Sequence, residues 1–134
     1  MVLVHRKGAT RALPPGHPLL PEKFKDTGQP AIIPGSMGTA SYVLVGTPKA
    51  AETFFSVNHG AGRTMSRGEA FRTISQQDFE RQMGNIIYNK PYRTIADEAP
   101  GAYKNIEEVI DTLVEAGLTR KVAKLRPLAV IKGD

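Results

Sequence analysis

The chain has 134 residues, of which 40% are hydrophobic and 23% are charged, the composition of one globular domain. Eighteen Lys and Arg against thirteen Asp and Glu give a formal net charge of +5, which permits nucleic acid as a partner without requiring it. No apolar run approaches the roughly 18 residues of a membrane span, the first residues lack the form of a signal peptide, and the absence of cysteine excludes disulfides and thiolate metal ligands. We therefore expect a single cytoplasmic unit over residues 1–134 that does not enter a membrane.

The first half of the chain is predicted to form short strands separated by loops. Strands are expected over residues 2–5, 30–33, 41–46 and 52–56, because each run is short and rich in β-branched or aromatic side chains. Four prolines between residues 13 and 21 exclude helix and strand there and predict an extended loop. A strand that begins at the first residues is also what we expect of a piece taken from a longer protein.

Helices are expected to follow. A short helix is predicted from residue 64 to about residue 71. A second helix begins at Ser75, whose side chain can cap it together with Asp78, and ends at Gly84.

The strongest helical pattern begins after Asn105, a residue type that favours the N-cap. Its apolar stripe ends before Gly117, which suits the left-handed position after a helix. Residues 128–131 then predict a buried strand. The expected fold class is α+β, with mixed short strands followed by helices and a closing carboxy-terminal strand.

The residues around His59 combine a potential nucleophile with glycines and positive charge. Gly60 and Gly62 can adopt positive φ, so successive N–H groups can form a concave site for phosphate oxygens. If a helix begins after Gly62, Arg63 and Arg67 lie on one helical face and can clamp a second phosphate. A neutral imidazole is a competent nitrogen nucleophile toward phosphorus. The segment therefore indicates phosphate chemistry at His59.

Six segments of the chain carry a resemblance to a known family. In chain order they are residues 4–12 (VHRKGATRA), 28–30 (GQP), 34–44 (PGSMGTASYVL), 59–63 (HGAGR), 102–104 (AYK) and 125–133 (LRPLAVIKG). In order and spacing they resemble the carboxy-terminal part of the RtcB-type RNA-splicing ligases, over essentially the whole chain. One such segment is a weak match, but six in register are a strong one.

The resemblance implies a GTP- and manganese-dependent ligase that joins an RNA 2′,3′-cyclic phosphate or 3′-phosphate end to a 5′-hydroxyl end, as in tRNA splicing or RNA repair. In that family the histidine of the His-Gly-Ala-Gly-Arg motif, here His59, attacks the α-phosphate of GTP. The resulting histidine–GMP phosphoramidate passes GMP to the RNA 3′-phosphate, and the 5′-hydroxyl then displaces it. RNA and GTP are thus the implied partners.

The resemblance also implies roles for other positions. The implied nucleotide-binding residues are Pro34, Gly35, Ser36, Met37, Ser41, Gly60, Ala61, Gly62, Tyr103 and Lys132. Ser36 and Ser41 match residues that hydrogen-bond the nucleotide, whereas Tyr103 and Lys132 match contacts to guanine. Lys7, Arg63 and Arg67 match positions that face phosphates, where positive charge adds salt-dependent affinity for RNA.

The chain departs from the family pattern at the metal. The family builds its manganese site from a cysteine and several histidines upstream of these segments, whereas this chain has no cysteine and only His5, His17 and His59. No metal ligand is therefore assigned here, and Mn²⁺ is expected to be held mainly by residues outside the chain. We expect the chain alone to be inactive or nearly so, to require the missing amino-terminal half as a partner, and to self-associate through apolar surface that this half would cover. Asp134 follows the usual Lys-Gly end of the family.

Other interpretations of the same residues remain open. His59 can be a turn residue bound to backbone, Ser36 and Ser41 ordinary turn and strand serines, and Tyr103 and Lys132 a core aromatic and an exposed charge. The basic residues between 120 and 126 can form a solvated face or an RNA track. At the level of function, the alternatives are a non-catalytic module that binds guanine nucleotides or RNA ends, and a subunit that completes a separately encoded metal-binding half.

Overall fold

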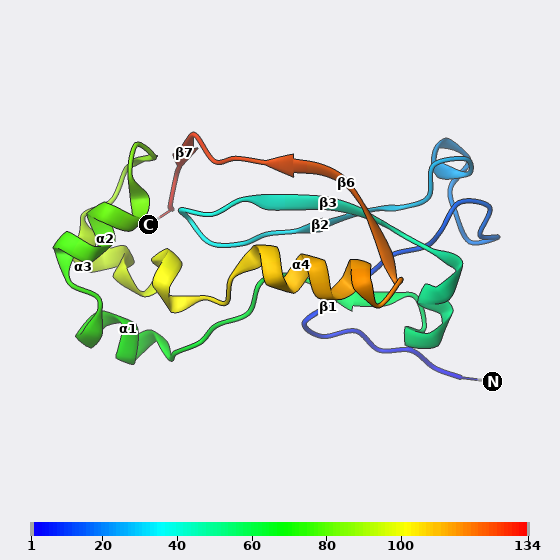
Figure 1. The fold of residues 1–134 in the computed structure, drawn as a ribbon, viewed down its shortest axis with the longest axis horizontal. Helices are drawn as coiled ribbons and strands as arrows, with labels where there is room; N and C mark the ends of the chain where they lie inside the picture. Colours follow the sequence, from blue (N-terminus) through cyan, green and yellow to red (C-terminus); the bar gives the residue numbers. More distant parts are fainter. Residues whose placement is uncertain (1, 134) are drawn as a thin grey trace.

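The computed structural model describes residues 2–133 and shows an elongated molecule organised around a three-stranded antiparallel sheet (Figure 1). Its strands are β2 (Pro30–Ile33), β3 (Ser41–Gly46) and β6 (Thr119–Leu125), in the order β2–β3–β6. The helix α4 (Ile106–Glu115) lies along one face of this sheet (Figure 1). The predicted strands at 30–33 and 41–46 are confirmed, whereas the sequence pattern does not anticipate β6.

The main core fills the space between this sheet and α4. Alternate residues of the paired strands β2 and β3 point toward the helix, as the period of two along a strand requires. Ala31 pairs with Leu44 and Ile33 pairs with Tyr42, and all four side chains are buried. They pack against the apolar stripe of α4, which includes the fully buried Ile110.

Two short strands extend the fold beside the sheet. The strand β1 (Ala9–Arg11) pairs antiparallel with β4 (Ser56–Asn58), which leads into the turn at His59. The predicted strands at 2–5 and 52–56 are both wrong. The first segment is extended and exposed, and the structure assigns it no strand.

The second of these segments fails because the chain turns sharply within it. A 3₁₀ helix, η2 (Pro48–Thr53), begins with a proline at its first position and occupies the start of the predicted strand. Phe54 and Phe55 then take φ values of 52° and 54°, a left-handed conformation that no strand contains. The chain enters β4 only after these two residues.

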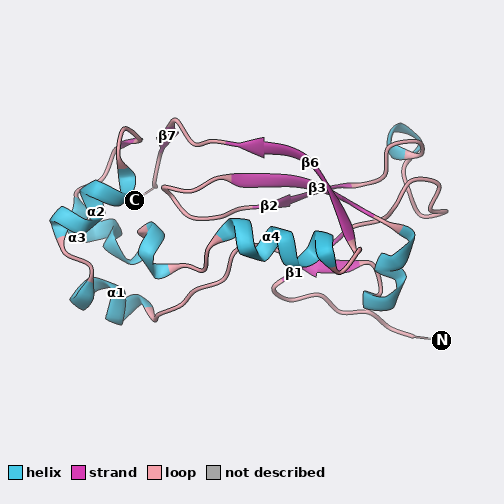
Figure 2. Cartoon of the chain, viewed as in Figure 1, coloured by secondary structure: helices cyan, strands magenta, loops and turns pink. Residues whose placement is uncertain are grey.

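The helical end of the molecule contains α1 (Arg67–Thr73), α2 (Gln76–Met83) and α3 (Tyr92–Ile95) (Figures 1 and 2). The helix α2 begins as predicted, because the Ser75 side chain accepts the backbone N–H of Asp78. The first helix begins later than predicted, at Arg67 instead of residue 64.

The later start of α1 has a local cause. Ser66 occupies the N-cap position and its side-chain oxygen accepts the backbone N–H of Glu69. Arg63 and Thr64 lie before this cap in an irregular segment. The expectation that Arg63 and Arg67 share a helical face is therefore wrong.

The remaining elements are short. They are the 3₁₀ helices η1 (Glu22–Phe24), η3 (Ala96–Glu98) and η4 (Pro100–Ala102), and the strands β5 (Ile87–Tyr88) and β7 (Ala129–Val130), which pair in parallel. The predicted closing strand is thus present but short. It is not buried, because the flanking Leu128 and Ile131 are 83% and 84% exposed.

A second core holds the helical end together and contains side chains from α1, α2, α3 and η4, together with Met37 from the loop between β2 and β3. Its largest fully buried members are Phe79 and Met83 of α2. Tyr103 packs against both this core and the core beneath the sheet, so it joins the two halves of the molecule. The predicted α+β fold class is confirmed (Figure 2). Among residues 2–133, no helix has the length and apolar content needed to cross a membrane.

Candidate nucleotide-binding site

A pocket of about 440 Å³ lies where the loop between β2 and β3 approaches the segment that carries β7. This size is in the range of small-molecule sites. Seven of the ten residues predicted to bind a nucleotide line it: Pro34, Gly35, Ser36, Met37, Ser41, Tyr103 and Lys132. The structure therefore brings together residues from three distant parts of the sequence.

The loop between β2 and β3 forms one side of the pocket as a compact turn. The backbone N–H of Ser36 donates to Oγ1 of Thr39 at 2.7 Å, and the two hydroxyl oxygens lie 2.9 Å apart. Gly35 is required at this turn, because a Cβ there would lie 2.3 Å from Thr39 Oγ1 and 2.5 Å from the Ala40 carbonyl oxygen. The turn thus presents backbone and hydroxyl groups to the pocket.

The opposite side of the pocket contains an ion pair. Nζ of Lys132 is bound to a carboxylate oxygen of Glu98, and both side chains are about one-third exposed. The backbone of Lys132 is fixed separately by the Asn89 amide, which accepts the Lys132 N–H at 2.9 Å and donates to its carbonyl oxygen at 3.1 Å. Sequence reasoning missed Glu98, whose only signal is its place in an acidic pair with Asp97.

Tyr103 and Arg63 form the inner end of the site. Nη1 of Arg63 donates to the Tyr103 hydroxyl at 3.1 Å, and the guanidinium carbon lies 4.9 Å from the ring centroid. The same guanidinium donates to the carbonyl oxygens of Met65 at 3.0 Å and Asp97 at 2.7 Å. Three of the five N–H groups of Arg63 are therefore used within the chain.

His59 lies outside the pocket lining but is tied to it through the backbone. Its side chain is exposed, and its own N–H donates to the Gly8 carbonyl at 3.3 Å. Two residues later the N–H of Ala61 donates to the carbonyl of Pro34, at 3.0 Å, on the pocket wall. Gly62 takes the expected positive φ, 78°, whereas Gly60 does not.

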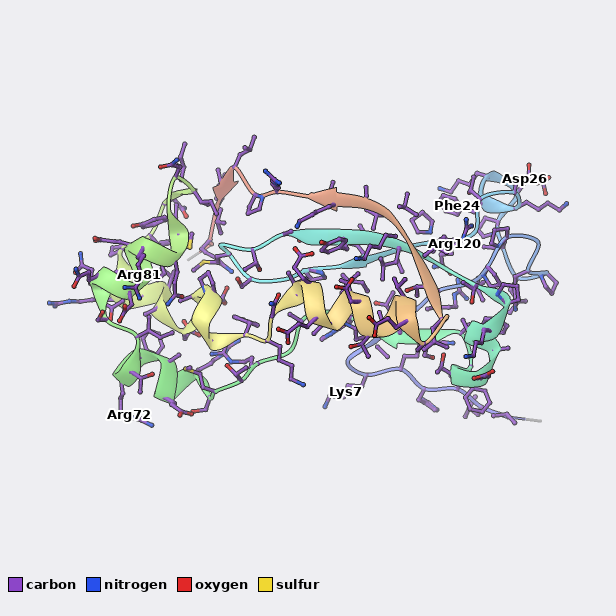
Figure 3. All side chains as sticks on the ribbon, in the orientation of Figure 1. Lys7, Phe24, Asp26, Arg72, Arg81 and Arg120 are labelled. Carbon is purple, nitrogen blue, oxygen red and sulfur yellow. The ribbon has the colours of Figure 1, made fainter. Side chains whose placement is uncertain are left out.

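The two other predicted phosphate-facing residues lie on different segments. Lys7 is exposed and precedes β1, whose partner strand β4 leads into His59. Its backbone therefore lies close in space to the His59 turn, where the His59 N–H donates to the carbonyl of Gly8. The Lys7 side chain projects away from the ribbon (Figure 3). Arg67 is the first residue of α1 and its Nε lies 3.6 Å from Oδ2 of Asp97.

The basic residues of β6 are partly engaged with α4. A register shift opposite Val43 and Leu44 places Lys121 and Lys124 on the same face of the strand, over the ring of Tyr42. Lys124 pairs with Glu107 at 2.6 Å, and Lys121 pairs with Asp111.

These contacts change the acidity of the groups that make them. The hydrogen bond to Glu107 raises the pKa of Lys124, and the hydrogen bonds from Lys124 and Tyr42 lower the pKa of Glu107. Burial, followed by the hydrogen bond to Glu107, raises the pKa of the Tyr42 hydroxyl. These two lysines therefore hold α4 against the sheet.

The residues that the structure describes do not form a donor set for a metal ion. Among residues 2–133, no three His, Asp or Glu side chains gather closely enough to hold one. The His17 ring instead packs edge-on against Phe55 at 4.6 Å between centroids, and its Nδ1 accepts the Leu19 N–H at 3.2 Å. Phe55 immediately precedes β4 and His59 follows it, so the two histidines lie at opposite ends of that strand.

Comparison with known proteins gives a consistent result. The family model described as "tRNA-splicing ligase RtcB" matches residues 1–133. The chain is 52% identical to the tRNA-splicing ligase RtcB of Pyrococcus furiosus over 136 aligned residues, which cover 98% of the chain and 14% of that protein. It is 49% identical to the protein of the same name from Methanocaldococcus jannaschii, again over 14% of its length, and 48% identical to that from Thermococcus kodakarensis, over 28%. The chain therefore spans well under a third of these curated relatives.

Proposed function

Since this chain belongs to the RtcB family of tRNA-splicing ligases and corresponds to its carboxy-terminal part, we propose that it is the segment of an RNA ligase that binds GTP and accepts GMP on His59. The reaction proposed is the joining of an RNA 2′,3′-cyclic phosphate or 3′-phosphate end to a 5′-hydroxyl end, in tRNA splicing or RNA repair. We also propose that the protein is located in the cytoplasm.

The observation that carries the proposal is the composition of the pocket. Residues assigned to the nucleotide on motif grounds alone, from three distant segments, line one cavity of about 440 Å³. They offer what a guanosine needs: hydroxyls of Ser36 and Ser41, the aromatic ring of Tyr103, and the ammonium of Lys132. An ammonium can donate to the O6 and N7 acceptors of guanine.

The proposed chemistry places the triphosphate between this pocket and His59. A ring nitrogen of His59 attacks the α-phosphorus of GTP, so a P–N bond forms and the bond to pyrophosphate breaks. A cyclic phosphate end first has to be opened by water, with cleavage of the bond between phosphorus and the 2′-oxygen, to give a 3′-phosphate. An oxygen of the RNA 3′-phosphate then displaces the histidine and takes GMP. Finally the RNA 5′-hydroxyl attacks that RNA phosphorus, and GMP leaves as the new phosphodiester forms.

The residues next to His59 have supporting roles in this proposal. The segment from Gly60 to Gly62 presents its backbone to the phosphates, and Gly62 supplies the positive φ. Lys7 and Arg67 face RNA phosphates, where their charge adds affinity that falls as salt rises. Arg63 faces phosphate with the two N–H groups that are not used in its three hydrogen bonds within residues 2–133.

Because the described residues contain no suitable donor cluster, we propose that the manganese ligands and the activation of the leaving pyrophosphate come from the amino-terminal part of the ligase. We accordingly propose that the chain by itself transfers GMP slowly or not at all.

The test is formation of a covalent adduct. The chain is incubated with α-labelled GTP and manganese, alone and together with the amino-terminal part of a related ligase, and is then tested for an acid-labile, alkali-stable label. We expect the label only when both parts are present, and we expect His59→Ala to remove it while His17→Ala retains it. Absence of label under both conditions would contradict the proposal and favour a non-catalytic binding module.

A further inference from the structure

The 3₁₀ helix η3 (Ala96–Glu98) lies next to the proposed nucleotide pocket and has no role in the reaction described above. Its last residue, Glu98, lines the pocket and is ion-paired with Lys132. Its middle residue, Asp97, is 7% exposed and is paired with Arg67. One short turn therefore holds two carboxylates that bind cations on different segments.

The turn is anchored by Arg63 and Arg67, neither of which lines the pocket. Arg63 donates to the Asp97 carbonyl oxygen at 2.7 Å and to the Tyr103 hydroxyl at 3.1 Å, so it connects the turn to the aromatic side chain of the pocket. A buried carboxylate such as that of Asp97 needs a cationic partner to offset its loss of hydration, and Arg67 supplies it at 3.6 Å. These contacts hold the backbone of η3 and hence the origin of the Glu98 side chain.

The position of the Lys132 ammonium depends on Glu98. The Asn89 amide fixes the Lys132 backbone, but a lysine side chain has four rotatable bonds beyond it. Within the described residues, Glu98 is the carboxylate that binds Nζ. An ammonium has three N–H donors, so binding Glu98 leaves donors for a ligand in the pocket.

We propose that Glu98 is a positioning residue, which holds the ammonium of Lys132 in the place where it meets the base of the bound nucleotide. Lys132 otherwise samples many rotamers and has to be ordered when the ligand binds, at a cost in affinity. Glu98 removes part of that cost before binding. The assignment of the base to this end of the pocket rests on the function proposed above.

The first test measures the side chain without any nucleotide. An amine-acylating reagent is applied to the whole chain, and the rate of labelling at Lys132 is followed by mass spectrometry. We expect Glu98→Gln to increase this rate, because it loosens the ammonium and exposes it. The matched control is Asp111→Asn, which loosens Lys121 in an ion pair away from the pocket and leaves labelling of Lys132 unchanged. Equal labelling of Lys132 in the wild type and in Glu98→Gln would overturn the proposal.

The second test measures binding of GTP and of inosine triphosphate, which lacks only the 2-amino group. Because the ion pair is partly exposed, we expect Glu98→Gln to weaken both nucleotides by about three- to fivefold, and Asp111→Asn to weaken neither. Weakening of GTP alone would overturn the positioning role, since it would mean that Glu98 touches the 2-amino group itself. A parallel fall in the unfolding midpoint would also overturn it, in favour of a structural role.

The two proposals fail separately. A wild-type chain that binds no guanine nucleotide, alone or with the amino-terminal part, would contradict the proposed function. The acylation result would still show whether Glu98 holds Lys132.

Discussion

The backbone N–H of Ala61 donates to the carbonyl oxygen of Pro34 at 3.0 Å, so the turn that carries His59 is bonded to the wall of the pocket. The contact lies two residues from His59 on one segment and next to Gly35 on the other. A change in the pocket turn is therefore transmitted directly to the His59 segment.

Gly35→Ala is expected to destabilise the fold and damage the pocket together. The added Cβ would meet Thr39 Oγ1 at 2.3 Å and the Ala40 carbonyl oxygen at 2.5 Å. Relief requires a backbone shift, at a cost of about 1–3 kcal/mol in the free energy of unfolding. Denaturant unfolding measures this cost, and Gly133→Ala, which meets nothing within 4 Å, is the control. A Gly35→Ala protein as stable as the wild type would contradict the packing described.

Arg63→Lys is expected to weaken nucleotide binding although it keeps the positive charge. Lysine cannot reach the Met65, Asp97 and Tyr103 oxygens at once as the planar guanidinium does. Calorimetric titration with GTP checks this result, with Arg72→Lys on the exposed side of α1 as the matched control. Unchanged affinity in Arg63→Lys would mean that only the charge matters and that the hydrogen bond from Arg63 does not position the Tyr103 side chain.

Glu107→Gln is expected to lower stability most at neutral pH. The hydrogen bonds from Lys124 and Tyr42 lower the pKa of Glu107 below its reference value of 4.5, so the ionised form is favoured in the folded state. The stabilisation that the ionised Glu107 carboxylate gives the folded state is present above about pH 4.5 and is lost as the pH falls through the lowered pKa. Unfolding free energies measured between pH 7 and pH 3 should therefore converge for the two proteins. A difference that does not change with pH would contradict the role assigned to the carboxylate.

The same cluster predicts a second loss of stability in alkali. The pKa values of Tyr42 and Lys124 are raised above their reference values of 10.0 and 10.5. Their contribution is present below pH 10 and is lost as the pH rises through the raised values. Tyr42→Phe should show a smaller loss of stability than the wild type between pH 9 and pH 11, followed by circular dichroism.

Asn105→Ala is expected to destabilise α4 by about 1 kcal/mol, because it removes the N-cap. The Asn105 side chain accepts the Glu107 N–H at 3.0 Å, and this helix packs on the main core. Thermal unfolding measures the effect. Asn85→Ala, at an exposed turn, should leave the midpoint nearly unchanged, and equal effects of both changes would show that the cap does not matter.

The elements that the sequence predicts well are those whose signals are local. Ser75 and Asn105 mark helix starts because their side chains satisfy backbone donors a few residues away. Gly117 marks the end of α4 by another local signal, because glycine readily adopts the positive φ of 74° found there. The strands at 30–33 and 41–46 are predicted because each is a short run rich in β-branched or aromatic side chains, and the structure confirms them.

The failures have tertiary causes. The strand β6 is missed because six of its seven residues are exposed and three are basic, two of which, Lys121 and Lys124, pair with α4. Residues 52–56 look like a strand by composition, but the left-handed Phe54 and Phe55 turn the chain. Glu98 is not predicted as a site residue because its contact is with Lys132, 34 residues away in the sequence.

The lining of the pocket comes from residues 32–41, 98–103 and 125–132, together with the segments that hold them in place. Bringing such distant stretches together costs loop-closure entropy, so no isolated part of the chain retains the cavity. A compound that fits it binds the folded chain and not the unfolded one, and thereby shifts the folding equilibrium by mass action, by about 2.7 kcal/mol at a hundred times its Kd. Thermal melting in the presence of purine and pyrimidine nucleotides can therefore rank ligands of this pocket without any turnover.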